Sequence, residues 1–412
     1  YICNELIKKG EKFALIFLKL DNIKYINDAF GHDVGDELLC KFGSLMNDII
    51  KEKGILTRHS GDEFIIIYRD FHNEEELLNY YKDVILKKSR KTIYFNKNSI
   101  DLGFTAGAAS YPRNGNTVEE LINKSDLMMY TSKAIAGKHN ADEMFIFNDK
   151  VYEKVMKVEL LKEELKKAIS RNELTVNYQP IVDKDGKIKK AEALIRWNSK
   201  KLGFIPPLDF IGYAEENGEI IKIGYWIIEE VCKRYEYFNI GEEDIQISIN
   251  VSPIQLMELD FVDNVKAIVD KYNMNYENLC FEITESVVLD ENTIVSNNLY
   301  KLNQLGIKIA LDDFGTGYSS FSYLKKFKLD ILKLDKSFIG SDEAIDYKIV
   351  NNIKDIAQGL NMEIVIEGVE NKNQCNALID IGCDYLQGYY FSKPLPLEKF
   401  KNFIKYNLRW RC

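Results

Sequence analysis

Residues 308–313 read Lys-Ile-Ala-Leu-Asp-Asp, a short apolar segment that ends in two adjacent carboxylates. Six more β-rich segments alternate with helix-length stretches in the same part of the chain, at 174–178, 190–195, 245–251, 279–283, 331–334 and 363–366. Short strands that alternate with helices are typical of a (β/α) barrel, whose functional side chains lie where the strands end. The sequence therefore predicts a C-terminal TIM-like (β/α) barrel with its site at the ends of these segments.

The length of 412 residues exceeds what one hydrophobic core usually organises, which predicts two domains. Before the barrel, a turn at Ser60-Gly61-Asp62 separates two expected strands. Further strands are expected at 13–20 and 100–109, and helices at 36–50, 74–88 and 117–136. These patterns predict an α+β domain over residues 1–149. Residues 150–170 have apolar residues at helical spacing and neither Gly nor Pro, which predicts a helical connector into a barrel domain at 156–412. The fold class of the whole chain is α/β.

The net charge of −9 argues against a broad surface that follows nucleic-acid phosphates. The seven cysteines are scattered, without a CxxC motif or zinc-ligand spacing, which favours a reducing compartment. No apolar run approaches the roughly 18 residues that a membrane span requires, and no signal-peptide pattern opens the chain. We therefore expect a cytoplasmic protein that binds no nucleic acid. Because the sequence begins at Tyr1, we also expect a fragment, and sensory or membrane regions upstream remain open.

Polar side chains lie at or just after the end of nearly every expected strand of the barrel. In chain order they are Glu192, Asn250, Glu282, Asp312, Asp313, Lys333, Glu367, Glu370 and Gln387. Hard cations such as Mg²⁺ and Mn²⁺ prefer carboxylate, amide and water oxygens, so a ring of these groups at one barrel mouth predicts a metal site. The adjacent Asp312 and Asp313 favour a second ion, and two ions suit the hydrolysis of a phosphodiester. Lys333 would orient the attacking water or neutralise developing charge.

Each of these residues also has a simpler structural interpretation. An Asp or Glu at a strand end is more often a helix N-cap, an ion-pair partner or a solvated charge, and Glu285 and Glu370 are balanced between the two interpretations. Asp312 and Asp313 precede Phe-Gly-Thr-Gly-Tyr-Ser-Ser, which on its own is equally compatible with a glycine-rich turn. Lys333 lies in a mostly apolar segment, where a functional role is favoured. The joint pattern favours a site.

Residues 156–405 resemble the EAL family of cyclic di-GMP phosphodiesterases. The shared motifs are Tyr178-Gln179-Pro180, Glu192-Ala193-Leu194 with Arg196-Trp197, Asn250-Val251-Ser252-Pro253, Glu282-Ile283-Thr284-Glu285, Asp312-Asp313-Phe314-Gly315-Thr316-Gly317-Tyr318-Ser319-Ser320, Lys333, Glu367-Gly368-Val369-Glu370 and Gln387-Gly388-Tyr389. No position that the family uses for chemistry departs from its pattern. The resemblance implies hydrolysis of cyclic di-GMP to linear pGpG with two Mg²⁺ or Mn²⁺ ions, in a homodimer.

The resemblance also implies a role for each residue of the site. The expected ligands of one ion are Glu192, Asn250, Glu282 and Asp312, and those of the other are Asp312, Asp313 and Glu367. The expected catalytic set is Lys333 at the attacking water, Glu367, Asp313, and Glu285 as a brace for the loop that links the metal site to the dimer interface. The expected substrate contacts are Gln179, Leu194, Arg196 at a phosphate, and Gln387 and Glu370, which are also candidates for supporting the metal ligands.

Residues 1–149 resemble the GGDEF family of diguanylate cyclases. The motifs are Asn27-Asp28, Gly31-His32, Gly35-Asp36 and Ser60-Gly61-Asp62-Glu63-Phe64. The family has a metal-binding Asp at the end of its first strand, where this chain has Lys19, although Asp21 and Asp62 remain. A lysine at that position would repel Mg²⁺, so the resemblance implies an inactive cyclase. Residues 51–54 read Lys-Glu-Lys-Gly and lack the RxxD product-inhibition site.

A GTP site without turnover is one interpretation of this first domain. Its candidate contacts are Lys24, Asn27, Asp36 and Asp62. A folded adaptor for dimerisation or signal relay is equally compatible with the sequence. Tyr130 and Lys133 match a helix that often carries a phosphate-binding Lys in the family, but the following Gly137-Lys138 is shifted by one residue.

Two other functions compete with the phosphodiesterase. A receptor that binds cyclic di-GMP without chemistry has no need for the complete set of metal ligands. A bifunctional cyclase and phosphodiesterase is disfavoured by Lys19. The sequence therefore favours a phosphodiesterase.

Overall fold

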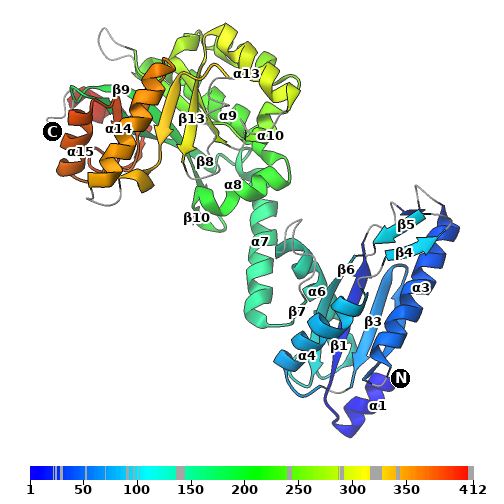
Figure 1. The fold of residues 1–412 in the computed structure, drawn as a ribbon. Helices are drawn as coiled ribbons and strands as arrows, with labels where there is room; N and C mark the ends of the chain where they lie inside the picture. The colour runs from blue at the N-terminus through cyan, green and yellow to red at the C-terminus, as the bar shows by residue number, and fades with distance from the viewer. Residues whose placement is uncertain are drawn as a thin grey trace. The chain divides into compact units, whose positions relative to one another are not determined.

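The computed structural model describes residues 1–21, 23, 26–27, 31–51, 53–69, 71–89, 92–95, 98–101, 103–135, 144–238, 244–285, 287, 292–315, 327–339 and 344–406. The chain divides into two compact units, Tyr1–Glu159 and Leu160–Cys412 (Figure 1). The division lies within helix α7 (Asp149–Ala168). No helix among these described residues is long and apolar enough to cross a membrane.

The N-terminal unit is built on a five-stranded sheet with the order β2-β3-β1-β6-β7 (Figure 1). Its strands are β1 (Phe13–Leu20), β2 (Gly54–Ser60), β3 (Glu63–Tyr68), β6 (Phe104–Tyr111) and β7 (Phe145–Ile146). The central strand β1 pairs antiparallel with β3 and β6. Strands β2 and β3 form the hairpin that the sequence predicts, and Gly61 at its tip has the left-handed φ of 43° that favours glycine.

Both faces of this sheet are covered, which explains the uninterrupted apolar run of β1. Ala14, Ile16 and Leu18 belong to the core cluster beneath α3 (His32–Ile50), whereas Phe13 and Leu15 belong to the cluster beneath α6 (Val118–Ile135). Successive side chains of a strand point to opposite faces, so every residue of a strand between two helical layers is buried. Among the described residues, this unit also has the helical segments α1 (Ile2–Lys9), α4 (Glu74–Tyr80), the π-helical η1 (Tyr81–Leu86) and α5 (Lys87–Ser89).

The prediction of a single strand at 100–109 is wrong in one respect. The structure has two strands there, because β5 (Asn98–Asp101) pairs with β4 (Thr92–Phe95) in a separate two-stranded sheet and β6 begins only at Phe104. Gly103 lies between them, and its backbone oxygen accepts a hydrogen bond from the Asp21 amide. The chain therefore changes partner strands at Gly103.

The C-terminal unit contains the predicted barrel. Eight strands close into a ring through the β8–β9 pairing. In ring order they are β9 (Ile188–Ser199), β11 (Gln246–Asn250), β12 (Leu279–Thr284), β13 (Lys308–Phe314), β14 (Ile331–Leu334), β15 (Glu363–Ile366), β16 (Tyr385–Gln387) and β8 (Leu174–Asp183). Two short strands, β10 (Gly203–Ile205) and β17 (Leu395–Pro396), extend the sheet beside β9 and β8.

One strand of the barrel runs against the others. All neighbours from β9 to β16 pair in parallel, but β8 is antiparallel to both β9 and β16. The connection from β8 to β9 is a tight turn in which Asp183 accepts hydrogen bonds from the amides of Asp185 and Lys187. Such a short turn can join only antiparallel strands, so the first strand of this barrel cannot be parallel to the second.

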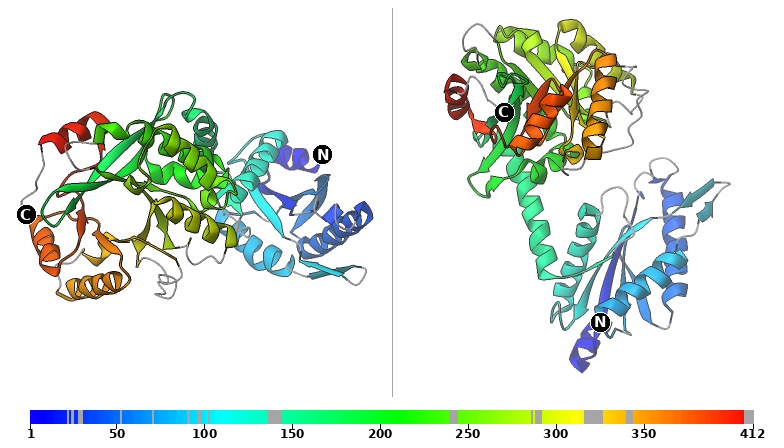
Figure 2. Two further views of the ribbon diagram at one scale, coloured as in Figure 1. Left: turned by 90° about the horizontal axis from the view of Figure 1, so that it is seen from above. Right: turned by 60° about the vertical axis from the view of Figure 1, so that its left-hand side comes forward.

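Helices surround the barrel (Figure 2, left). They are α8 (Pro207–Glu216), α9 (Glu219–Lys233), α10 (Pro253–Leu256), α11 (Phe261–Lys271), α13 (Thr293–Leu305), α14 (Ala344–Gly359), α15 (Lys372–Ile381) and α16 (Leu397–Tyr406), with the short 3₁₀ turns η3 (Tyr235–Phe238), η4 (Tyr276–Asn278) and η6 (Lys336–Phe338). The main core lies between these helices and the outward side chains of the strands. Capping boxes at Ser252 and Asn371 fix the beginnings of α10 and α15 just after β11 and β15.

The alternation of side chains along the strands positions the site. A small apolar cluster made of Ile181, Cys280, Ala310, Ile331 and Val365 is separate from the main core, which contains the intervening residues of the same strands. Residues two positions further along a strand face the same side, which here is the barrel interior. On β12, β13, β14 and after β15 those positions are Glu282, Asp312, Lys333 and Glu367. The strand geometry therefore places these four charged side chains directly above the apolar cluster. They are called the charged layer below.

Candidate active site

The charged layer is centred on Lys333, whose side chain is almost completely buried. Its Nζ lies 2.6 Å from Glu367 Oε1 and 2.7 Å from Glu282 Oε2. The same atom lies 3.0 Å from Asp312 Oδ1 and 3.7 Å from Glu192 Oε2. Four predicted carboxylates, from three strands and one following turn, therefore meet at one ammonium group.

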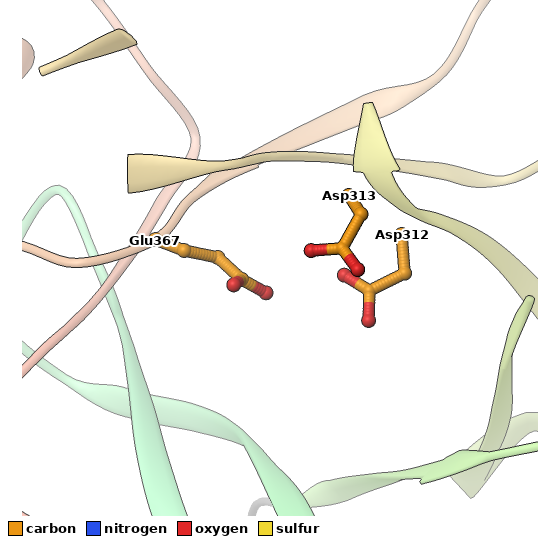
Figure 3. A group of neighbouring side chains, drawn as sticks. All are labelled: Asp312, Asp313 and Glu367. Atoms are coloured by element: carbon orange, nitrogen blue, oxygen red, sulfur yellow. The ribbon is translucent and has the colours of Figure 1, made fainter. Parts of the chain in front are cut away.

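The carboxylates outnumber this ammonium. Asp312, Asp313 and Glu367 each offer an oxygen, and these oxygens all lie within 4.8 Å of one another (Figure 3). Glu282 Oε1 is buried and accepts no hydrogen bond from any described residue. Uncompensated charge in a desolvated place is costly unless cations or hydrogen bonds balance it. The donor set therefore fits hard divalent cations, which bind carboxylate oxygens.

A local irregularity brings Asp312 and Asp313 to the same region, although neighbours on a regular strand face opposite sides. The pairing of β13 with β14 shifts register between Leu311 and Phe314. Asp313 adopts the left-handed region with a φ of 54°, which few non-glycine residues do. Figure 3 shows both carboxylates directed toward Glu367. The bulge thus converts two consecutive residues into a pair of candidate metal ligands.

Glu192 accepts hydrogen bonds from two amide side chains, and one of these also contacts a third amide. Asn250 Nδ2 donates to Glu192 Oε1 at 2.8 Å, and Gln387 Nε2 donates to Glu192 Oε2 at 2.7 Å. Gln387 also lies 3.3 Å from Gln179 Oε1, and Gln179 in turn donates to the backbone oxygen of Ser392 at 3.1 Å. Gln179 and Gln387, expected as substrate contacts, are buried next to a candidate metal ligand and fix its orientation.

The other expected residues are more dispersed. Glu285 Oε1 accepts a hydrogen bond from the Gly315 amide at 2.8 Å, which matches the expected brace after Asp313. Residues 316–320 of that motif lie outside the described residues. Glu370 is exposed, and its backbone amide donates to Gln374 Oε1 at 2.8 Å. The structure therefore does not bring the Glu370 side chain into the charged layer.

Arg196 and Leu194 follow Glu192 on the same face of β9, both half-buried. Arg196 lines a cavity of about 630 Å³, together with Thr175, Asn198 and Phe204. Sequence reasoning missed Thr175 and Phe204. Thr175 faces Arg196 across the β8–β9 hairpin. Recognising the turn of this hairpin in the sequence would have given its register, and with it this pair of neighbours.

The pKa values of the charged layer reflect its burial. Burial raises the pKa of Glu282 well above its ordinary value, and Glu192 and Asp312 raise it further against the opposing effect of Lys333. Burial, with a smaller contribution from Asp312, raises the pKa of Glu367 to about 7 and also raises that of Asp313. Burial lowers the pKa of Lys333, but the surrounding carboxylates more than compensate and the result is well above its ordinary value. Lys333 is therefore cationic at neutral pH.

A second cluster of charges lies at the end of β1 in the N-terminal unit. Lys19 faces Glu63 across the β1–β3 pair, with Nζ 2.8 Å from Glu63 Oε1 and 3.9 Å from Asp62 Oδ1. The hydrogen bond to Glu63 raises the pKa of Lys19, and the same bond lowers the pKa of Glu63. The ammonium thus already pairs with the acidic residues of the Ser60–Phe64 motif. Sequence reasoning named Lys19 but missed Glu63 as its partner, which the cross-strand register shows.

The expected GTP contacts are only partly described. Asn27 Oδ1 is buried and accepts no hydrogen bond from the described residues, and a Cβ on Gly35 would overlap it. Asp36 is exposed, and Asp62 is half-buried beside Lys19. Lys24, the side chain of Lys133, and Gly137 and Lys138 lie outside the described residues.

The fold and the site define a (β/α)-barrel protein with a candidate divalent-metal centre at the carboxyl ends of its strands. Two family models match the chain, "EAL domain" over residues 162–394 and "Diguanylate cyclase, GGDEF domain" over residues 3–139. The chain belongs to the EAL family, in the tandem arrangement of a GGDEF domain followed by an EAL domain.

Two curated relatives match nearly the whole chain. The signaling protein YkoW of Bacillus subtilis is 36% identical over 95% of this chain and 49% of its own length. The cyclic di-GMP phosphodiesterase PdeR of Escherichia coli is 31% identical over 97% of this chain and 60% of its own length. The chain thus spans about half the length of these curated relatives. A solved structure described as "PaMucR Phosphodiesterase, c-di-GMP complex" is 35% identical and covers 58% of this chain and 99% of its own, with a TM-score of 0.56.

Without divalent cations, the free energy of unfolding should fall as the pH rises from about 5 to about 8. Glu282 and Glu367 have raised pKa values, so the folded protein keeps protons that the unfolded chain has released, and stability is lost as they dissociate. Glu367→Gln should reduce this loss below about pH 7. Added Mg²⁺ should stabilise the wild type more at pH 8 than at pH 5, because protons and cations compete for the same oxygens.

Urea unfolding in EDTA and in Mg²⁺ at several pH values measures these changes. If the metal-free wild type becomes more stable over this pH range while Glu367→Gln behaves identically, the assignment of the charged layer is wrong.

Proposed function

We propose that the C-terminal unit hydrolyses cyclic di-GMP to linear pGpG with two divalent cations. The observation that supports this most directly is the charged layer itself, in which carboxylates from several strands surround Lys333 at the carboxyl ends of the strands. Support for the substrate comes from the relatives, since one is named a cyclic di-GMP phosphodiesterase and a similar solved structure is described as a c-di-GMP complex.

The resemblance to the EAL family suggests which residues would hold each of the two ions. Glu192, Asn250, Glu282 and Asp312 would hold one ion, and Asp312, Asp313 and Glu367 would hold the other. Mg²⁺ or Mn²⁺ would activate a water molecule at neutral pH and neutralise charge on the phosphodiester. The bond broken is a P–O ester bond of the cyclic dinucleotide, with water supplying the hydroxyl group to phosphorus and a proton to the leaving oxygen.

The side chains of this chain would then orient the reactants. Lys333 keeps a fixed positive charge beside Asp312 and Glu367, where it can hold the attacking water and stabilise negative charge that develops on phosphate oxygens. Arg196, which lines a cavity and lies on the same face of β9 as Glu192, would bind a phosphate through its planar guanidinium. Glu285 would hold the backbone after Asp313 through the Gly315 amide.

Replacing single metal ligands tests this proposal. Glu192→Gln and Asp312→Asn should each lower the rate of pGpG formation by more than about 100-fold, the upper end of what even indirect changes at metal sites cost. Asp263→Asn, an exposed acidic residue on α11, is the matched control and should leave the rate unchanged. Chromatography of cyclic di-GMP incubated with protein and Mn²⁺ measures the product.

Full activity in Glu192→Gln or Asp312→Asn would refute the metal assignment. A wild type that binds cyclic di-GMP but forms no pGpG with Mg²⁺ or Mn²⁺ would instead establish the receptor function.

We further propose that the N-terminal unit is inactive as a cyclase, because Lys19 pairs with Glu63 where the family binds a cation. A regulatory GTP site remains a second candidate. The observation that favours it is the buried Asn27 Oδ1, an acceptor with no described donor that the N–H groups of guanine would satisfy. Homodimer formation and a cytoplasmic location likewise stay predictions.

With GTP as the substrate, the protein should form no cyclic di-GMP. GTP should change the rate of pGpG formation, and Asn27→Ala should weaken this effect about tenfold, the cost of one hydrogen bond to a buried group. Synthesis of cyclic di-GMP from GTP would contradict the first expectation. An effect of GTP that is identical in the wild type and Asn27→Ala would contradict the second.

A further inference from the structure

The segment that follows β14 leaves the barrel directly after Lys333 and Leu334. Asp335 begins it as an N-cap, with its side chain accepting from the Ser337 amide at 2.9 Å, and the turn η6 follows. The backbone amide of Phe338 donates to the oxygen of Asp335, which closes the turn. Residues 335–339 therefore form a short, internally bonded element.

This element contacts the backbone next to Asp313. Gly315 has a φ of 95°, and a Cβ on it would overlap the ring of Phe338. Phe338 is half-buried and packs against the main core of the barrel. On its other side, the Gly315 amide donates to Glu285. The backbone that follows Asp313 is thus held between a carboxylate and an aromatic ring.

The same element also contacts the turn that bears Glu367. Gly368 has a φ of 72°, and a Cβ on it would overlap Cβ of Lys336. Gln374 Nε2 donates to the Ile339 oxygen at 3.0 Å, while Gln374 Oε1 accepts from the Glu370 amide at 2.8 Å. Residues 335–339 therefore touch both backbone segments that carry the cluster Asp312, Asp313 and Glu367.

We propose that Phe338 is a positioning residue for this cluster. Asp313 and Gly315 both have left-handed backbone conformations, and for Asp313 such a conformation persists only where the surroundings enforce it. The Phe338 ring fills the space into which the backbone at Gly315 would otherwise relax. Without it, the Asp313 carboxylate would leave the position that it shares with Asp312 and Glu367. The role of Phe338 rests on the proposed metal centre.

The test is a titration of the full chain with Mn²⁺, in which electron paramagnetic resonance measures the concentration of free ion. Wild-type protein should bind two ions per chain. Phe338→Ala should lower the affinity for one of the two ions by about tenfold or more, the usual cost of removing a group that supports a metal ligand. Phe338→Leu, which retains part of the ring's volume, should show a smaller loss in Mn²⁺ affinity of about threefold, below the roughly 10–100-fold cost of removing a supporting group outright. Tyr272→Ala removes a half-buried aromatic ring beside α11, away from the cluster, and should bind both ions normally.

The outcomes separate the two proposals. If the wild type binds no Mn²⁺, the metal centre itself is wrong and the role of Phe338 fails with it. In a second outcome, the wild type binds two ions while the Mn²⁺ affinities of Phe338→Ala stay within about twofold of the wild-type values. Such an effect is too small for a supporting group, so only the role of Phe338 is then refuted. If Phe338→Ala does not fold, Phe338→Leu decides, and unchanged binding of both ions in that variant refutes the proposal.

Discussion

The site depends on one buried ammonium group among several carboxylates. Lys333 is the only cation that the described residues contribute to the charged layer, and it contacts Glu282, Asp312 and Glu367 at 3.0 Å or less. A lone buried carboxylate would take up a proton or force the chain to reorganise. Lys333 instead stabilises part of the negative charge of the carboxylates, and the negative charge that it does not balance favours the binding of cations. The same interaction therefore keeps the layer folded and prepares it for metal.

The fold supports this interaction with an ordinary barrel and a few local departures from it. The period-two alternation of the strands places the charged residues above the apolar cluster in the barrel interior. The bulge in β13 adds Asp313 to Asp312. Gly388 lies so close to the backbone of Val369 that a Cβ would overlap it, which holds the turn after Gln387 against the turn after Glu367. Each departure brings one more oxygen, or one more supporting amide, toward the same point.

Much of this arrangement could be predicted from the sequence. Alternating strands and helices predict the barrel, and Lys333 within an apolar segment predicts a buried lysine. The positions that follow Cys280, Ala310, Ile331 and Val365 by two residues are charged, which the strand period makes visible. The antiparallel β8 was not predicted, because it depends on recognising the Asp183 turn as a hairpin. The bulge at Asp313, the ion pair of Lys19 with Glu63 and the contact of Phe338 with Gly315 arise between segments distant in sequence, and no local pattern reveals them.

The two units differ in how far a lysine balances the charge of the carboxylates around it. In the barrel, the single positive charge of Lys333 does not balance the charges of the surrounding carboxylates, which favours the binding of cations. In the N-terminal unit, Lys19 pairs closely with Glu63 and lies near Asp62, so the charge that a cation would bring is partly present. This contrast explains why we assign catalysis to the barrel and, at most, nucleotide binding to the first unit.

Anomalous scattering from crystals grown with Mn²⁺ and a non-hydrolysable analogue of cyclic di-GMP tests the central claim most directly. The account predicts two manganese peaks in the barrel, one among Glu192, Asn250, Glu282 and Asp312 and the other among Asp312, Asp313 and Glu367, with a phosphate of the analogue beside them. An analogue bound in the barrel with no manganese at these carboxylates would contradict it.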